Sequence, residues 1–523
     1  MSLIKRIMNV GGLTMVSRVL GFVRDVLMAS SLGAGLAADA FFIAFKLPNF
    51  FRRLFAEGAF TAGFVPLFSK RLGKDEQDPR RAISFASKTL GVLLPSLLLV
   101  LIIFEVSMPW VMELLTGGFD EAEPQKFELV VKLGRLTFPY LMLISLVTLL
   151  AGVLNGLGKF SAAAFAPVLL NICMISGLLF WPGGATHSAT TLATAVSIAG
   201  IVQLVFLIYA VRRAGISIKL PKPKLTPSIK QLLAVAAPAA IGAGIMQINL
   251  LIDLLIAARM LPEGSISYLF YADRLNQLPI GVIGVAVGTV LLPSISRALG
   301  AGDSQGAQKQ QNRAMEFALF LTLPAAAALM LIPNELVGTL FERGAFTSID
   351  TSAASMALVA YASGLPAYVI IKVLTPGFFA RQNTKTPVKI AAFSLVLNTS
   401  LNLLLIGPLA HVGLALATSI AAWVNAAMLY YFLRRDGHFV ADARLKSRLW
   451  RIIIATLIMG AALIMLIPYL KEGFMAGGFA QLQSLTLLIF AGIIAYSIAS
   501  LLFGAINRAD FKAFLRQNNS PSA

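Results

Sequence analysis

Long apolar stretches separated by short polar segments run along the whole chain, for example at residues 90–104 and 452–467. Blocks of about 20 apolar residues match the hydrocarbon thickness of a bilayer. Apolar windows bounded by charges and turn residues predict about 14 membrane-spanning helices. The predicted spans are 7–32, 38–66, 82–108, 129–152, 160–181, 189–212, 231–258, 268–296, 313–333, 351–378, 387–406, 411–434, 450–468 and 484–505.

The composition agrees with a membrane protein. Of the 523 residues, 58% are hydrophobic and only 13% are charged, whereas about a quarter of the residues in a soluble domain are charged. An ordinary soluble enzyme, a coiled coil and a disordered protein are therefore excluded. A single cysteine, Cys173, excludes a disulfide framework and a cysteine-based metal site. The sequence contains no Walker motif, so we expect no direct use of ATP.

The basic residues are distributed unevenly between the two sets of loops. With the N-terminus in the cytoplasm, the cytoplasmic segments hold 30 Lys and Arg residues, and the outer loops hold three: Lys126, Arg343 and Lys471. Basic residues collect on the cytoplasmic side of membrane helices. This unequal distribution indicates a cytoplasmic N-terminus. It also accounts for the net charge of +19 without nucleic-acid binding, so we predict no nucleic-acid partner.

The chain repeats itself at a constant offset of about 227 residues. The matching pairs are Pro66 and Pro293, Gly73 and Gly300, Phe119 and Phe346, Pro139 and Pro366, and Asn171 and Asn398. Each repeat holds an even number of spans, so the halves insert the same way up, as parallel repeats do in transporters with a central cavity. The predicted domains are a first lobe at 1–215, a cytoplasmic linker at 216–230, a second lobe at 231–440, two further helices at 441–510 and a cytoplasmic tail at 511–523.

Several charged residues fall inside predicted spans, where a charge costs at least a few kcal/mol unless it faces water or a partner. Cations outnumber anions near the middle of spans one, two and eight. The cations are Arg18, Arg24, Lys46, Arg52, Arg53 and Arg274, and the anions are Asp25, Asp39, Glu57 and Asp273. Because the arginine fork suits phosphate and carboxylate oxygens, this surplus predicts a cavity for an anionic, phosphorylated substrate.

Two alternatives remain open for polar residues in the spans. Some cations can form internal salt bridges or reach the membrane surface: Lys46, Arg53, Lys132, Arg135, Arg259 and Lys372. Four residues of the second half, Asp253, Asn398, Asn402 and Thr418, are candidates for a sodium site. Asn and Thr in membrane helices also simply hydrogen-bond neighbouring helices. We predict no other cofactor and no catalytic residue.

The motifs along the chain resemble those of a known family. The run SRVLGFVRDVLMASSLGAGLAADAFFIAFKLPNFFRRLFAEGAFTAGFVPLF is similar to the N-terminal signature of the MurJ (MviN) family of lipid II flippases, in the MOP transporter superfamily. YADRLNQLP, GVAVGTVLLPSIS and LFERGAFT continue the likeness in the second half. The resemblance implies an all-α polytopic membrane protein of 14 helices, with two six-helix lobes and two C-terminal helices that form a groove for a prenyl tail.

The resemblance also implies a function and a site. The function is to move undecaprenyl-pyrophosphate-linked disaccharide-pentapeptide (lipid II) across the bacterial inner membrane for peptidoglycan synthesis. The family's cavity charges match Arg18, Arg24, Asp39, Arg52 and Arg274, with Asp25 beside them. Some relatives are thought to bind sodium, but Asn402 stands here where a carboxylate would strengthen the site. We therefore expect membrane potential to drive transport.

The expected mechanism is alternating access, in which Asp25 and Asp39 exchange arginine partners as the substrate is released. Lipid II and membrane lipids are the expected partners, with other cell-wall synthesis proteins as further candidates. Two other functions stay open: a MOP-type carrier of another lipid-linked oligosaccharide or of drugs, and a non-transporting scaffold or lipid-synthesis enzyme.

Overall fold

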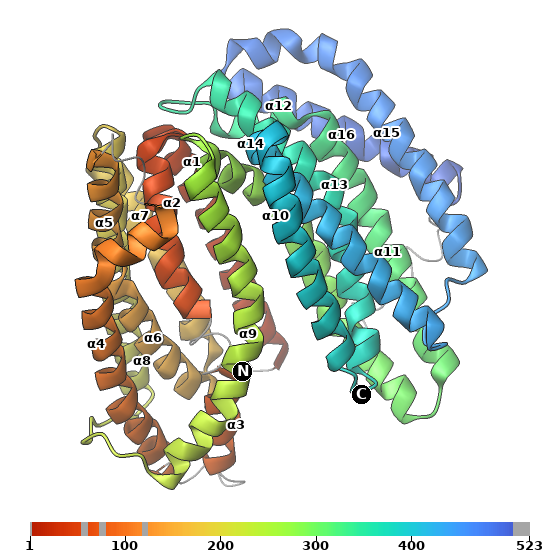
Figure 1. Ribbon diagram of the computed structural model, residues 1–523. Helices are drawn as coiled ribbons and strands as arrows, with labels where there is room; N and C mark the ends of the chain where they lie inside the picture. The colour runs from red at the N-terminus through yellow and green to blue at the C-terminus, as the bar shows by residue number, and fades with distance from the viewer. Residues whose placement is uncertain (1–2, 54–60, 73–79, 118–123, 506–523) are drawn as a thin grey trace. The chain divides into compact units, whose positions relative to one another are not determined.

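The computed structural model describes residues 3–53, 61–72, 80–117 and 124–505. Every regular element in these ranges is a helix (Figure 1). The predicted tail at 511–523 lies outside them. The helices are α1 (Leu3–Leu32), α2 (Leu36–Phe51), α3 (Thr61–Leu72), α4 (Arg80–Thr116), α5 (Pro124–Thr137), α6 (Pro139–Gly156), α7 (Phe160–Phe180), α8 (Ala185–Arg213), α9 (Pro227–Met260), α10 (Ser265–Gly300), α11 (Ser304–Leu331), α12 (Pro333–Phe341), α13 (Ser348–Phe379), α14 (Lys385–Arg435), α15 (Ala443–Ala476) and α16 (Gly478–Leu502).

Nine helical segments in the described part of the chain are long and apolar enough to cross a membrane. They are Arg80–Thr116, Pro124–Gly156, Phe160–Phe180, Ala185–Arg213, Ser304–Leu331, Ser348–Phe379, Lys385–Arg435, Ala443–Ala476 and Gly478–Leu502. A helix satisfies its backbone hydrogen bonds internally, which the interior of a bilayer requires. Long apolar segments in a bilayer therefore have to be helical, and the nine segments of the structure are helices of this kind.

Most predicted spans coincide with helices to within several residues, such as 160–181 with α7 and 189–212 with α8. The span predicted at 129–152 is divided into α5 and α6, because Pro139 begins a new helix directly after Phe138. Proline lacks a backbone N–H and favours the first turn of a helix. The pattern of hydrophobic residues does not reveal this break, because apolar residues lie on both sides of Pro139.

The two spans predicted at 387–406 and 411–434 both lie in α14, which is interrupted at Ala410. This residue has φ 47° and ψ −130°, and Pro408 precedes it by two positions. After the break the chain passes close to itself: a Cβ at Gly413 would lie 2.5 Å from the carbonyl oxygen of Leu405. Only glycine fits there, so the reversal between the two spans depends on this position.

The chain packs into two compact units. The first contains residues 1–267 together with 343–347, and the second contains 268–342 and 348–523. Helix α9 thus packs with the first unit, against α3 and α4, and α10 begins in the first unit and continues in the second. The division predicted at the linker 216–230 concerns the sequence repeat and stays a prediction.

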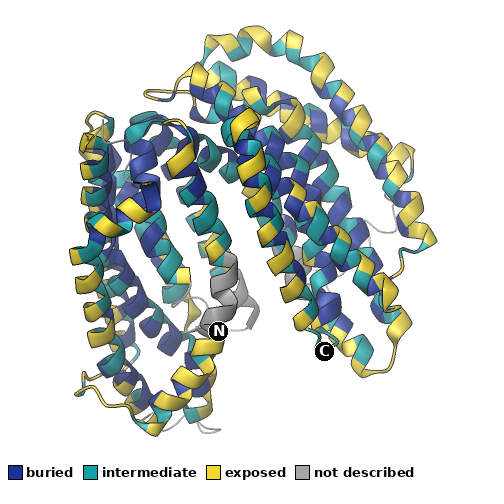
Figure 2. Ribbon diagram, viewed as in Figure 1, coloured by how far each residue is buried: buried dark blue, intermediate teal, exposed yellow. Residues whose placement is uncertain are grey.

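Each unit has its own apolar core. In the first unit, Phe64 stacks on Phe68 and on Phe85, with ring centroids 5.5 and 5.4 Å apart. In the second unit, buried residues of α10, α11, α13, α14 and α15 form one cluster that includes Phe378 and Leu433. Figure 2 shows exposed positions along the outer side of α15, where Tyr469 remains 84% exposed. Large apolar side chains on outer faces are the expected contacts with lipid tails.

Candidate functional site

The predicted site residues Arg24 and Asp25 form a buried ion pair on α1, where α1 packs against α7. Arg24 donates from Nε and Nη2 to Asp25 Oδ1, at 3.0 and 2.7 Å. Its Nη1 donates to Asn171 Oδ1 on α7, at 2.9 Å. The two charged residues retain 8% and 3% of their exposure. The guanidinium is therefore neutralised and oriented by side chains of its own unit.

Asn171 connects this pair to the backbone of α1. While its oxygen accepts from Arg24, its Nδ2 donates to the carbonyl oxygen of Ser17, at 2.9 Å. Sequence reasoning had singled out Asn171 only as the repeat counterpart of Asn398. Its role as a positioning residue for Arg24 was missed, because sequence spacing does not show which helix packs against α1.

Replacing Asn171 with alanine is expected to lower the free energy of unfolding by about 1–3 kcal/mol. The substitution leaves a buried guanidinium N–H without its acceptor and the Ser17 carbonyl without its donor. Thermal unfolding of the purified protein measures the effect. Thr190→Ala is the control in the same unit, because Thr190 is half-buried and its hydroxyl bonds only within its own helix in the described contacts; equal stability of the two variants would contradict the expectation.

Asp39 is also buried, at 7% exposure, but its described partners are not arginines. One carboxylate oxygen accepts the backbone N–H of Gly264 at 2.7 Å, and the other accepts from the backbone N–H and the hydroxyl of Ser267, at 2.8 and 2.5 Å. A helix N-terminus leaves unpaired N–H groups and carries a partial positive charge. In this conformation Asp39 caps the start of α10, so exchange with an arginine stays a prediction for other states.

The other predicted cations of the first unit are more accessible. Arg18 is exposed on α1. Arg52 is half-buried just after α2 and donates from Nε to Asn49 Oδ1 at 3.2 Å, and Arg53 next to it is exposed. Cations at the C-terminal end of a helix are favoured by the helix dipole. Glu57, the predicted anion of this stretch, lies outside the described residues.

The second unit contributes Asp273 and Arg274 on α10. The Arg274 guanidinium lies over the ring of Phe270, 4.6 Å from its centroid, and Gln277 donates to Asp273. Both charged side chains are half-buried. The eight predicted site residues are thus divided, with six in the first unit and these two in the second.

Three of the four candidates for a sodium site lie together on α14. Asn402 donates to Asn398 Oδ1, and Asn398 donates to Thr418 Oγ1, both at 3.3 Å. Asp253, the only carboxylate among the four, belongs to α9 in the first unit. The described contacts are those of side chains that hydrogen-bond across a helix pair. Sodium binding stays a prediction.

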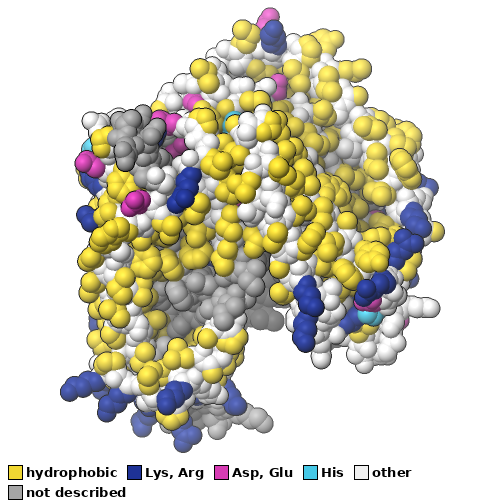
Figure 3. All heavy atoms as spheres, viewed as in Figure 1, with side chains coloured by type: hydrophobic (Ala, Val, Ile, Leu, Met, Phe, Trp, Pro, Cys, Tyr) yellow, Lys and Arg dark blue, Asp and Glu magenta, His cyan; other side chains and the backbone are white. Residues whose placement is uncertain are grey.

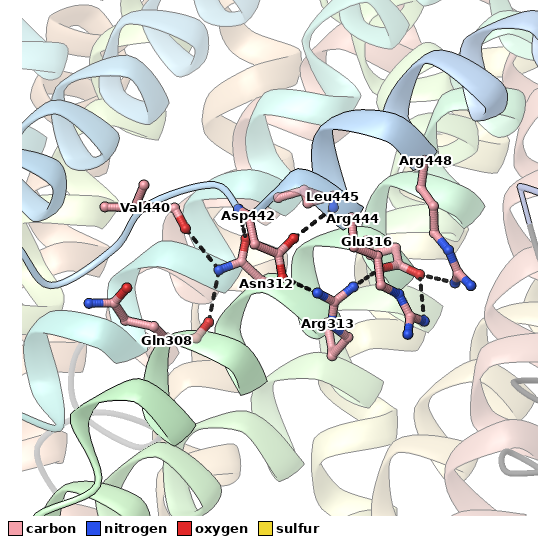
Figure 4. A network of polar contacts seen from close by, with 9 residues as sticks. All are labelled: Gln308, Asn312, Arg313, Glu316, Val440, Asp442, Arg444, Leu445 and Arg448. Carbon is pink, nitrogen blue, oxygen red and sulfur yellow. Dashed lines mark hydrogen bonds and ion pairs between the residues drawn. The ribbon is translucent and has the colours of Figure 1, made fainter.

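A polar network that the sequence reasoning missed joins α11 to the start of α15 (Figure 4). At its centre the buried carboxylate of Glu316 accepts from three arginines: Arg313, Arg448 and Arg444, the last at 3.3 Å. Arg313 also pairs with Asp442. Glu316 and Arg448 are only 6% and 7% exposed, so the network of three cations and two anions has a buried ion pair at its centre, while Arg444 at its edge has a side chain that is 45% exposed.

Backbone contacts extend this network into the segment between α14 and α15. Asn312 donates to the carbonyl of Val440 at 3.0 Å and accepts the N–H of Asp442 at 3.1 Å. Asp442 in turn caps α15 by accepting the N–H of Leu445 at 2.7 Å. The spacing of three residues between Arg313 and Glu316 is the one local signal of this network, and it does not indicate that α15 supplies the other partners.

Basic side chains gather at one end of the first unit (Figure 3), in agreement with the unequal numbers of Lys and Arg in the loops predicted to be cytoplasmic and those predicted to be outside. On the face drawn in Figure 3, hydrophobic side chains cover the middle, and Lys and Arg gather at the lower end, around the ends of α3, α4 and α8. The segments predicted to be cytoplasmic include the loops at these ends.

Comparisons with known proteins identify the family. The family model "Lipid II flippase MurJ" matches residues 28–485. Proteins named probable lipid II flippase MurJ are similar to the chain over most of its length: that of Rhizobium tropici is 44% identical, covering 97% of this chain and 95% of the relative, and that of Rhizobium meliloti is 46% identical, covering 95% and 92%.

Solved structures agree. A lipid II flippase MurJ in an inward closed conformation has a TM-score of 0.77 and 29% identity, covering 94% of this chain and 98% of the other. A MATE family transporter of the MOP superfamily, at 15% identity and a TM-score of 0.66 with 82% and 97% coverage, shares the fold. The all-α, multi-pass membrane fold predicted from the sequence is confirmed, and the chain belongs to the MurJ family of lipid II flippases.

Proposed function

We propose that the protein moves lipid II from the cytoplasmic to the periplasmic leaflet of the bacterial inner membrane, as a transporter without covalent chemistry. Membership of the MurJ family supports the substrate. The observation that supports the site is the buried Arg24, which lies on α1 within the span predicted at 7–32 and is held by Asp25 and Asn171. A pyrophosphate is the kind of anion that a guanidinium binds through two parallel hydrogen bonds.

The ion pair between Arg24 and Asp25 suggests how the protein could capture and release the pyrophosphate of its substrate. Before substrate arrives, Asp25 compensates the buried cation, so the empty site does not carry an uncompensated charge in a dry environment. The pyrophosphate then competes with Asp25 for the guanidinium, and Asp25 competes in the opposite direction at release. Because the two residues are adjacent on α1, the competing carboxylate is always close by. Binding is thereby kept reversible.

The transport cycle that we propose is alternating access of a cationic cavity, with the N-terminus in the cytoplasm and the prenyl tail held along α15 and α16. Arg18, Arg52, Arg53 and Arg274 supply the further positive charge, and Asp39 and Asp273 the balancing negative charge. Membrane potential is the proposed driver, with sodium at Asp253, Asn398, Asn402 and Thr418 as the alternative. Other cell-wall synthesis proteins are proposed partners.

Depleting the protein in cells tests this function. An externally added reagent that cleaves lipid II measures how much of it has reached the outer leaflet. We expect the accessible fraction to collapse while total lipid II rises, because synthesis continues inside. A fall in total lipid II would instead indicate a role in synthesis, and no change in either quantity would indicate a different substrate.

A further inference from the structure

A surface pocket of the first unit lies between α4 and α5, which pack against each other (Figure 1). Its volume is about 480 Å³, and it is lined in part by Pro109 of α4 and by Glu128, Val131, Lys132, Arg135 and Leu136 of α5. The residues of α5 recur every three or four positions, so they form one face of the helix. Pockets that hold small ligands commonly measure about 300–1,000 Å³, and this pocket falls within that range.

Charged side chains from both helices meet at the pocket. Glu128, Lys132 and Arg135 line it and are exposed. Glu105 of α4 is half-buried and interacts electrostatically with Arg135, and its Oε1 accepts no hydrogen bond from the part of the chain that the structure describes. Glu128 and Lys132 are one helical turn apart, a spacing at which side chains can pair, but the described contacts include no ion pair between them. The acids and bases of this pocket therefore do not fully satisfy one another.

The pocket lies at the predicted outer boundary of the membrane. The predicted span 82–108 ends there and the span 129–152 begins there, with Lys132 and Arg135 in its first two turns. Basic residues are scarce on this side, since the outer loops hold only three. Two neighbouring cations are therefore unusual here, and ionisable residues within membrane spans commonly mark a functional site. Phospholipid headgroups meet the protein at the same level.

Apolar side chains continue from the pocket along α4. Ile102 and Val106 are 59% and 66% exposed. They precede Pro109 by two turns and one turn, so they lie on the same face of the helix. Exposed apolar residues of a membrane helix contact lipid tails. A lipid with its headgroup in the pocket would therefore have its acyl chains against this face of α4.

We propose that this pocket binds a zwitterionic phospholipid whose headgroup ends in a primary ammonium, as in phosphatidylethanolamine. Lys132 and Arg135 hold the phosphate, because ammonium and guanidinium groups donate strong hydrogen bonds to phosphate oxygens. Glu128 accepts from the ammonium of the lipid. The order along α5 fits this orientation, since Glu128 lies one to two turns nearer the end predicted to face the periplasm, and the ammonium of the lipid is attached beyond its phosphate.

The balance of charge at the pocket favours this lipid over an anionic one. Lys132 and Arg135 stand against Glu105 and Glu128, so the four charges sum to zero. A headgroup without net charge leaves the site neutral, whereas an anionic headgroup would add an uncompensated charge next to the apolar region, which is costly. The primary ammonium also matters, because a trimethylated ammonium has no N–H to donate to Glu128. This inference goes beyond the proposed transport function and does not depend on it.

Tryptophan fluorescence measures lipid binding at this place, because Trp110 directly follows Pro109 and is 66% exposed. Trp181→Phe, Trp423→Phe and Trp450→Phe leave Trp110 as the single tryptophan. The purified protein is reconstituted in brominated phosphatidylcholine, which quenches the fluorescence, and an unbrominated lipid is titrated in. We expect phosphatidylethanolamine to relieve quenching at a roughly three- to tenfold lower mole fraction than phosphatidylcholine, the gain from two or three partly exposed ion pairs.

Substitutions in the pocket test the assignment of each charge. Glu128→Gln and Lys132→Gln are each expected to bring the preference for phosphatidylethanolamine to within about twofold. Glu113→Gln is the matched control, since Glu113 is an exposed acid near the same end of α4 that does not line the pocket; it should keep the full preference. A variant with Trp450 as its single tryptophan, 69% exposed on α15, should report no preference.

Several results would overturn the proposal. Equal binding of phosphatidylethanolamine and phosphatidylcholine at Trp110 would do so, as would an equal preference reported by Trp450. A preference for phosphatidylglycerol that Glu128→Gln increases would assign the pocket to an anionic lipid instead. Both Glu128 and Lys132 are exposed, so their variants should keep the melting temperature of the parent, and an unchanged preference in both would overturn their assignment. Failure of the lipid II assay would leave all of these results intact.

Discussion

Replacing Glu316 with alanine is expected to destabilise the protein by about 3–5 kcal/mol, the cost of removing one partner from a buried ion pair. The buried Arg448 would lose its ion pair with Glu316, and Arg313 would keep its ion pair with Asp442. The helix start at 443 would remain capped by Asp442, so the damage should come from uncompensated charge. Thermal unfolding of the purified protein and its abundance in membranes measure the effect.

Two further variants test whether the expected loss of stability comes from the burial of the ion pair and from the charge of Glu316. Arg444→Ala removes a cation whose side chain is 45% exposed, and the expected change is within about 1 kcal/mol, as for surface pairs. Glu316→Gln keeps the shape of the side chain but not its charge, so it is expected to resemble Glu316→Ala. A melting temperature for Glu316→Gln equal to that of the parent would show that the charge of Glu316 contributes nothing.

Arg24→Ala is expected to abolish the ability of the protein to support growth when it is the only copy in the cell. A charge-assisted hydrogen bond contributes roughly 1.5–3 kcal/mol, and a bidentate contact with a pyrophosphate provides two. The predicted loss of substrate affinity is therefore on the order of 100-fold or more. Complementation of a depletion strain and the lipid II accessibility assay both report this loss.

A double variant distinguishes substrate binding from folding. Arg24→Ala alone removes the cation that the buried Asp25 pairs with in the described contacts, and this loss by itself lowers stability. Removing both charges, in Arg24→Ala with Asp25→Ala, restores the balance of charge. We expect the double variant to accumulate in the membrane near the parent level and still fail to support growth; growth at the parent rate would assign Arg24 to the fold alone.

The sequence predicted the helical class well, because it follows from local hydrophobicity, and the depth of the charged residues in the membrane stays a prediction. It did not predict which partner each charge has. Asp25 was expected beside Arg24, and the structure pairs the two, but the second partner of Arg24, Asn171, was not predicted. The identity of Asn171 as a partner depends on α7 lying next to α1, and a single sequence contains no direct information on which helices are neighbours.

Asp39 shows a second limit. Counting side-chain charges suggested an arginine partner, but the structure satisfies this carboxylate with backbone N–H groups at a helix start. Such groups are present in every helix and are invisible to a count of charged residues, although they act as a partial positive charge. Glu316 was missed although its partners are charged side chains. Arg444 and Arg448 lie about 130 residues away in the sequence, at the start of another helix, so their spacing does not show that they meet Glu316.

The backbone N–H of Leu36 donates to the carboxylate of Glu263 at 2.6 Å, and the two residues are 227 positions apart, which is the offset of the sequence repeat. When two equivalent positions of a repeat touch, a half-length ancestor would have made the same contact with a second copy of itself, at the axis of a two-fold homodimer. In such a dimer any substitution appears on both sides at once. In a single chain that holds both halves each side varies alone, and here one side provides a backbone donor while the other carries a carboxylate. A single chain can therefore place two different residues at equivalent positions of one contact, which a symmetric dimer of identical subunits cannot do.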